Sequence, residues 1–383
     1  MYRLNEADQS ILETLIDLAD RHVAPASANV DAEGRFPAEA VAALGTAGLL
    51  GLTVPPQFGG MGKGPRVAAA VLEALAERCS SSAMVYLMHL CGVACYAAVP
   101  ERTSDFLAPA ARGRHLSTLA FSERGSRSHF WAPVSRAVRN DGQVSLSAEK
   151  SFVTSAGHAD GYVVSTLDAE GSTPVASTIY LVLANDPGVS ASTPWDGLGL
   201  RGNSSGPLSL KDVTIPTERA LTEHGKGLDM MLGIVLPLFQ VGSAAVALGL
   251  AEAAVRKTTA HLTQAKLEHQ GTVLAEVPVL RTRLAQMRIE TDRARAHLVA
   301  VLDSLESPGP MTQLLVLEAK AAATEAAVVV TDLAMRACGG AALARGLGLE
   351  RLFRDARAPI VMSPSTDQAH DFIGRALCGM EVF

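Results

Sequence analysis

A loop rich in serine, glycine and arginine is a stretch of the sequence whose side chains could hold a ligand. It reads SERGSRSHF from Ser122 to Phe130 and follows Leu119, Ala120 and Phe121, which have the character of a short strand. Hydroxyl, amide and guanidinium groups are donors that suit phosphates and polarised oxygens. The same composition is typical of a plain surface turn, so the loop alone leaves both interpretations open.

The cysteines are a second group with chemistry of their own. The chain has 5 cysteines, Cys79, Cys91, Cys95, Cys338 and Cys378. Cys91 and Cys95 lie close in sequence, but no CxxC pair is present and no set of Cys and His residues completes a zinc site. The sequence therefore predicts buried, reduced thiols in a cytoplasmic protein and no metal site.

The composition excludes several classes of partner. The net charge is −6 over 383 residues, which gives no electrostatic reason to bind nucleic acid or an anionic membrane. No apolar run is expected to reach the roughly 20 residues that span a bilayer. The first residues, MYRLNEADQS, lack the apolar core of a signal peptide.

The elements that must position these residues change in type along the chain. Residues 1–117 show helical spacing of apolar residues, as in ADQSILETLIDLADRHV. Residues 118–223 alternate short runs of β-formers with turns, which predicts an antiparallel β domain. Residues 224–383 return to long helical patterns of small and apolar residues, which suit a four-helix bundle. The predicted fold is α+β, in the order helices, sheet, helices.

This order, together with several motifs, resembles the acyl-CoA dehydrogenase family of flavoproteins over essentially the whole chain. The segments that carry the resemblance are VPPQFGGMG, FSERGSRSH, KSFVTSAGHADGYVVS, GLGLRGNSSGPLSLKDVTIP, CGGAAL and LERLFRDAR. Each segment alone is weak, whereas their shared order is specific. The resemblance implies bound FAD, an acyl thioester substrate on CoA or on an acyl carrier protein, a homo-oligomer (tetramer or dimer) and an electron acceptor flavoprotein.

The resemblance also implies which residues contact the flavin. Phe121 and Ser122 are expected to place backbone and hydroxyl groups at the isoalloxazine ring, and Ser128 to reach the pyrophosphate. Phe152, Val153 and Thr154 are expected to line the other side of the ring. Fixed hydroxyl and amide donors there would stabilise the charge of a reduced flavin.

Further site residues follow from the C-terminal motifs. Arg336, Cys338, Gly339 and Gly340 match the segment that holds the FAD diphosphate of a neighbouring subunit, where glycines let backbone N–H groups approach phosphate. Taken alone, the two glycines are equally those of a helix C-cap. Ser365 and Asp367 match positions near the adenosine of FAD.

The usual catalytic base is missing from both places where the family carries it. Most members have a Glu before a Gly-Thr-Ser turn near the C-terminus, and Ser363 stands at that position in IVMSPSTDQAH. Other members place a carboxylate near Phe239 or Gln240, where this chain has no acid. A serine hydroxyl cannot replace a carboxylate base unaided. Asp367 is either a base from a shifted turn or a ligand of the FAD ribose, so Ser363 and Asp367 are the catalytic candidates.

A second departure concerns the diphosphate. The family has Arg-x-x-Phe-Gly after the first bundle helix, whereas this chain has Leu267 and Gln270 before Gly271. The lost contact is worth about 1.5–3 kcal/mol. Arg336, where the family usually has Gln, could restore a cation.

Two classes of function follow. The first is an FAD-dependent dehydrogenase of acyl thioesters with altered base chemistry, as in the acyl-carrier-protein branch of secondary metabolism, where a hydroxyacyl group could be oxidised at its alcohol. The second is a flavin protein that is no longer a dehydrogenase: a monooxygenase, which needs no base for the alpha proton, or an inactive flavin-binding homologue.

Overall fold

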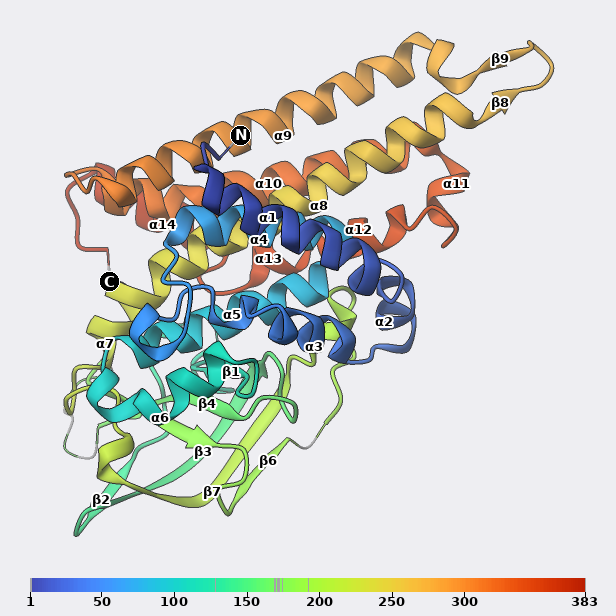
Figure 1. The fold of residues 1–383 in the computed structure, drawn as a ribbon. Helices are drawn as coiled ribbons and strands as arrows, with labels where there is room; N and C mark the ends of the chain where they lie inside the picture. Colours follow the sequence, from blue (N-terminus) through green and yellow to red (C-terminus); the bar gives the residue numbers. More distant parts are fainter. Residues whose placement is uncertain are drawn as a thin grey trace.

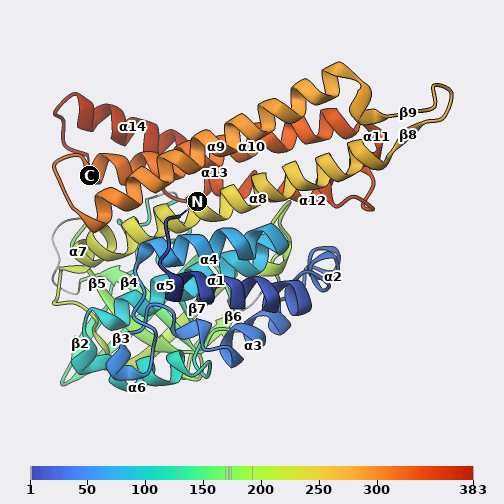
Figure 2. The same cartoon turned by 45° about the horizontal axis from the view of Figure 1, so that its top comes forward.

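The fold stacks two helical layers and a β layer, and Figure 1 shows the N-terminal helices between the C-terminal bundle and the β domain. Figure 2 shows the same order after rotation. The structure is a computed structural model, and it describes residues 2–127, 129–168, 170, 173, 175–191 and 193–382. The predicted α+β order of helices, sheets and helices is confirmed.

The N-terminal layer is built around a helix that is buried on nearly every face. This helix, α5 (Ser80–Ala97), has Ala, Leu, Val, Met and Cys on most of its faces, and it packs against strand β1 (Ser117–Ala120) and helices α4 (Pro65–Arg78) and α8 (Leu236–Gln264). Its neighbours begin at proline in several cases, which suits the first turn of a helix. The helices are α1 (Glu6–Leu18), α2 (Ser27–Glu33), α3 (Ala38–Thr46), α4 (Pro65–Arg78), α5 (Ser80–Ala97) and α6 (Pro100–Ala111).

The β domain contains sheets of order β1-β4-β5 and β2-β3-β7-β6 in the described part of the chain. Inward-facing apolar side chains such as Val144, Val164 and Ile215 form a core of their own between them. The strands are β1 (Ser117–Ala120), β2 (Val138–Asn140), β3 (Gln143–Val153), β4 (Gly161–Leu167), β5 (Ser177–Leu183), β6 (Val189–Ala191) and β7 (Gly206–Pro216).

The pairing is antiparallel, as predicted, except between β1 and β4, which run parallel. The reason is the connection: after β1 the chain crosses to the other sheet for β2 and β3 before it returns as β4. A return from a neighbouring sheet, unlike a tight hairpin, can restart in the original direction.

The C-terminal layer is a bundle of long helices in which α10 contacts α8, α9 and α14. Small residues on α8 allow close approach to the N-terminal layer: a Cβ on Gly249 would lie 2.4 Å from the carbonyl oxygen of Glu73. The elements are α7 (Gly227–Met230), α8 (Leu236–Gln264), β8 (Lys266–Leu267), β9 (Thr272–Val273), α9 (Pro278–Glu306), α10 (Thr312–Cys338), α11 (Gly340–Leu343), α12 (Leu349–Asp355), α13 (Ala358–Val361) and α14 (Thr366–Leu377).

The prediction that no apolar run is long enough to span a bilayer was wrong. The helical segments Ser80–Ala97 and Gly227–Gln264 are long and apolar enough by composition. Of their most apolar windows, 83% and 67% are buried inside the protein. Core helices of a large domain meet the same criterion, because burial in protein and burial in lipid favour similar residues.

Candidate functional site

The loop after β1 is held at its start by a buried ion pair. The Glu123 carboxylate accepts a hydrogen bond from the Lys150 ammonium at 2.5 Å, and others from the Val134 and Ser135 amides at 2.9 and 2.8 Å. Burial disfavours the charged carboxylate, but the ammonium and the Ser135 hydrogen bonds outweigh it and lower the pKa of Glu123. Glu123 and Lys150 therefore fix the loop instead of offering free acid–base chemistry.

The structure brings the predicted residues of this loop beside those at the end of β3. The Ser151 amide donates to the Ser122 carbonyl at 2.9 Å, and the Thr118 hydroxyl donates to the Thr154 carbonyl at 2.8 Å. Phe121 and Val153 are buried in the same region. Ser122 and the ring-lining candidates thus lie on neighbouring strand ends. The Ser128 prediction lies outside the described residues.

Phe152 presents an aromatic ring to the surface at the end of β3. Its backbone has a φ of 55°, within the left-handed region, and the residue is 70% exposed. The Trp195 ring meets it edge-on with centroids 6.3 Å apart. A non-glycine residue with positive φ at the end of a strand marks a position where the chain re-aims a side chain.

The catalytic candidates lie in the loop between α13 and α14 and in the first turn of α14. Ser363 is half-buried and precedes Pro364 through a cis peptide bond. Ser365 caps α14: its hydroxyl accepts from the Gln368 amide at 3.3 Å, while the Gln368 side chain accepts from the Ser365 amide at 3.0 Å. Asp367 is exposed in the first turn of α14. The capping box fixes where the helix starts, and hence the position of both candidates.

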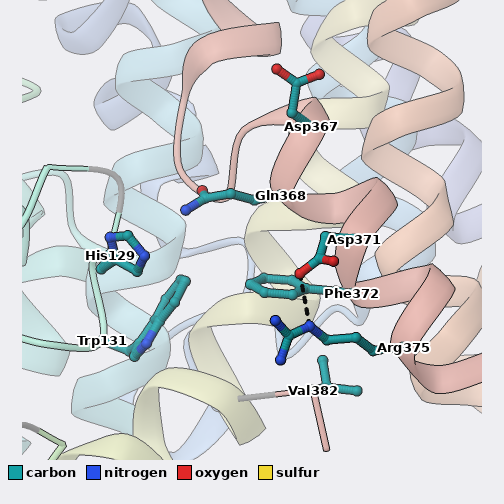
Figure 3. A pocket seen from close by; sticks show the side chains of 8 residues that line it. All are labelled: His129, Trp131, Asp367, Gln368, Asp371, Phe372, Arg375 and Val382. Carbon is teal, nitrogen blue, oxygen red and sulfur yellow. Dashed lines mark hydrogen bonds and ion pairs between the residues drawn. The ribbon is translucent and has the colours of Figure 1, made fainter. Parts of the chain in front are cut away.

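A cavity of about 390 Å³ lies between α14 and the loop after β1. His129 and Trp131 face Phe372 and Arg375 across it, and the rings of Trp131 and Phe372 are 5.6 Å apart between centroids (Figure 3). Figure 3 also shows the Asp367 carboxylate directed away from these rings. Ser363 is not among the residues that line this cavity, which are His129, Trp131, Asp367, Gln368, Asp371, Phe372, Arg375 and Val382.

The second position considered for a base holds an amide. Gln240 lies on α8, is fully buried, and has no hydrogen-bond partner for either amide atom within the described part of the chain. The adjacent Phe239 offers no titratable group. A buried unpaired amide costs free energy unless water or a ligand satisfies it.

The predicted diphosphate segment lies elsewhere in the chain. Arg336 pairs with Asp332 at 2.7 Å, and its side chain is 65% exposed. Cys338 is buried, and burial raises the pKa of its thiol. Gly339 has a φ of 57°, and a Cβ on it or on Gly340 would meet nothing within 4 Å. Figure 1 shows α11, which begins at Gly340, at the end of the bundle and away from β1 and β3, and Figure 2 shows it away from β3 as well.

The β8–β9 turn and most of the cysteines lie outside the segments that carry the other candidates. Leu267 ends β8, and Gln270 is exposed in the β8–β9 turn. Among the described residues, no group of His, Cys, Asp and Glu could hold a metal ion. The cysteines are unpaired there, with Cys378 exposed, contrary to the prediction that all are buried. Cys378 follows α14, where the apolar helix face has ended.

Sequence reasoning missed Lys320 on α10. Its ammonium donates to the Met362 carbonyl at 2.8 Å and to the Pro364 carbonyl at 2.6 Å. The available signal was a lysine in a run of small and apolar residues, LLVLEAKAAATEAA, where a charge is unusual in a buried face.

The residues present fit a cofactor with a flat ring and a diphosphate. Ser122 and Thr154 lie at neighbouring strand ends together with the exposed Phe152, and the buried Thr154 hydroxyl lies 3.0 Å from the Ser205 hydroxyl. Gly339 and Gly340 leave their backbone open to close approach. Such donors suit ring heteroatoms and phosphate oxygens, respectively.

Comparisons with known proteins agree over the whole chain. Models of the N-terminal, middle and C-terminal domains of acyl-CoA dehydrogenase match residues 5–114, 118–213 and 225–377. The mitochondrial short-chain specific acyl-CoA dehydrogenase of Bos taurus is 28% identical, over 92% of this chain and 86% of that protein.

Solved structures show the same fold. Butyryl-CoA dehydrogenase from Megasphaera elsdenii superposes with a TM-score of 0.91 at 23% identity, covering 98% of this chain and 99% of that one. The prolyl acyl carrier protein oxidase AnaB superposes with a TM-score of 0.87 at 20% identity, covering 98% and 99%. Domain models, relatives and fold agree, and the chain therefore belongs to the acyl-CoA dehydrogenase family of FAD-dependent oxidoreductases.

Proposed function

We propose that this protein oxidises a short acyl group held as a thioester, on CoA or on an acyl carrier protein, without a carboxylate at the usual position of the base. The observation that carries the proposal is the loop between α13 and α14. This loop has the hydroxyl of Ser363 and no carboxylate. The next carboxylate along the chain, that of Asp367, lies in the first turn of α14 and is exposed.

FAD, when bound, supplies the acceptor for the hydride that leaves the substrate. In our proposal Phe121 and Ser122 contact its ring, and Phe152, Val153 and Thr154 line the other side. The support is their position on adjoining strand ends and the donors that they offer. Their task is to bind and orient the ring, because a fixed donor stabilises developing charge without reorganising.

A second copy of the chain completes the cofactor site in this proposal. Gly339 and Gly340 are open, and α11, which begins at Gly340, lies away from β1 and β3 in Figure 1 and away from β3 in Figure 2. One chain therefore offers each half of the site at a different end, which a homo-oligomer would bring together. The expected species in solution is a dimer or tetramer, measurable by light scattering.

The missing carboxylate restricts the substrate. Abstraction of a carbon-bound alpha proton needs a base of raised pKa in a dry pocket. A hydroxyacyl substrate oxidised at its alcohol would lose a proton from oxygen, which demands less of the base. AnaB acts on a carrier-bound prolyl group, so an acyl carrier protein is the carrier to test beside CoA.

The test is anaerobic mixing of the purified flavoprotein with thioesters. Butyryl-CoA, a short hydroxyacyl-CoA and the same acyl groups on a carrier protein are mixed separately, and the flavin absorbance is followed. Bleaching without added reductant supports the dehydrogenase. Reduction only by an external reduced flavin or nicotinamide, followed by oxygen uptake, would favour the monooxygenase. No response to any of these reagents would favour an inactive homologue.

A further inference from the structure

Lys320 occupies an unusual position on α10. Its side chain is among the largest that are fully buried, with 1% of the residue exposed. The ammonium donates to the carbonyls of Met362 and Pro364, at 2.8 and 2.6 Å. These carbonyls stand on either side of Ser363, so one cation holds the backbone before and after this residue.

No acidic side chain neutralises this ammonium in the described part of the chain. On α10 itself, Glu318 lies 3.5 Å from His297 of α9, and Glu325 lies 3.6 Å from His370 of α14. Asp367 is exposed on α14, and α13 carries no titratable group. Burial alone lowers the pKa of Lys320 to about 7.

A buried cation without a counter-charge contributes little to the stability of a folded protein. Moving an ammonium from water into an apolar interior costs free energy that two carbonyl hydrogen bonds only partly offset. An apolar side chain of similar length would fill the same space at lower cost. The presence of Lys320 is therefore explained better by the two backbone carbonyls that it binds than by a gain in stability.

We propose that Lys320 is a positioning residue: by binding the carbonyls on both sides of Ser363, its ammonium fixes this part of the active-site loop. The inference deepens the proposed function, and its relevance to catalysis rests on that function. The hydrogen bonds are strongest while the amine is charged, because charge-assisted bonds are about twice as strong as neutral ones. The loop should therefore loosen as pH rises through about 7.

The direct test is hydrogen exchange of the loop, measured by mass spectrometry on the whole holoprotein. Protection factors for residues 361–366, corrected for intrinsic exchange, are compared about one pH unit below and above neutrality. We expect protection in the wild type to fall on the order of tenfold as the amine loses its charge. In Lys320→Met, protection should be low at both pH values. Equal, pH-independent protection in both proteins would overturn the proposal.

The matched control is Lys257→Met. Lys257 lies on α8 and donates to the Leu347 carbonyl at 3.0 Å, so it also binds a backbone oxygen from within the bundle, but away from Ser363. Its substitution should leave the exchange of residues 361–366 unchanged. Equal loosening in both variants would show a general effect on the bundle and contradict positioning.

Flavin reduction provides the catalytic readout. With butyryl-CoA or a carrier-bound acyl group that bleaches the wild type, Lys320→Met should slow reduction by about 10–100-fold, the scale expected for a small misplacement at an active site. The KM should change far less than kcat. If no thioester bleaches the wild type, the proposed function fails while the exchange experiment still decides the role of Lys320. An unchanged reduction rate in a well-folded variant would refute positioning.

Discussion

Replacement of Glu123 by Gln tests whether the buried pair holds the loop that frames the flavin site. Glu123 is 2% exposed, receives the Lys150 ammonium at 2.5 Å, and also binds the Ser135 hydroxyl at 2.5 Å. Glu123→Gln keeps an acceptor but leaves Lys150 buried without its counter-charge. Breaking one partner of a buried pair costs about 3–5 kcal/mol, and we expect a loss of unfolding free energy of that size.

Urea unfolding followed by tryptophan fluorescence is a suitable assay. The chain has 2 tryptophans, Trp131 and Trp195, and both lie in loops of the middle region near the site. The matched control is Glu149→Gln, one residue before Lys150, whose exposed carboxylate accepts from the Ser209 hydroxyl at 2.6 Å. This control should change stability by less than about 1 kcal/mol.

The pH dependence follows from the lowered pKa of Glu123. A carboxyl group whose pKa is lower in the folded than in the unfolded state stabilises the protein above about pH 4.3, its unfolded value. This stabilisation is lost as pH falls through the folded pKa. The difference between wild type and Glu123→Gln should therefore shrink below about pH 4.

A double-mutant cycle with Lys150→Met completes the experiment. Because Glu123→Gln/Lys150→Met contains neither buried charge, it should be more stable than the sum of the single effects by about 1–3 kcal/mol. Additive effects would refute the proposal that the Glu123–Lys150 ion pair fixes this loop. An unfolding free energy of either single variant within about 1 kcal/mol of the wild type would refute it as well.

The remaining predictions concern the cofactor, the base and the buried lysine. Arg336→Ala should lower the flavin-to-protein absorbance ratio of the purified protein, and unchanged occupancy would contradict the diphosphate assignment. Thr154→Ala should shift the midpoint potential of the flavin, since it removes a donor proposed for the ring; an unaltered potential counts against that contact. Ser363→Glu should create or raise oxidation of butyryl-CoA, followed by flavin bleaching. Wild-type stability should rise between about pH 7 and 10, because unfolding takes up a proton on Lys320 there, and Lys320→Met should lack this slope in urea titrations.

The fold was predictable where the sequence pattern is local. The apolar residues of Ser80–Ala97 predict a helix, and the short runs of β-formers predict strands, without any knowledge of tertiary contacts. The parallel pairing of β1 with β4 could not be predicted, because it depends on the path of the chain between the two sheets and not on the sequence of either strand. Local pattern gives elements, whereas pairing across a long connection needs the tertiary structure.

The site divides in the same way. Ser122 and Thr154 were found through motifs, and the structure places their strand ends together. Lys320 contacts the loop around Ser363 from a distant part of the sequence. The direction of the Lys320 side chain depends on how α10 packs against the last helices, which the local sequence does not determine. The left-handed backbone of Phe152 was likewise hidden, since aromatic residues rarely adopt it.

Anaerobic spectrophotometry of the purified protein tests the central claim most directly. A short acyl thioester, on CoA or a carrier protein, should bleach the bound flavin with no other reductant present. A flavin that stays oxidised with every such thioester, yet is reduced by a nicotinamide or free reduced flavin and then consumes oxygen, would contradict it.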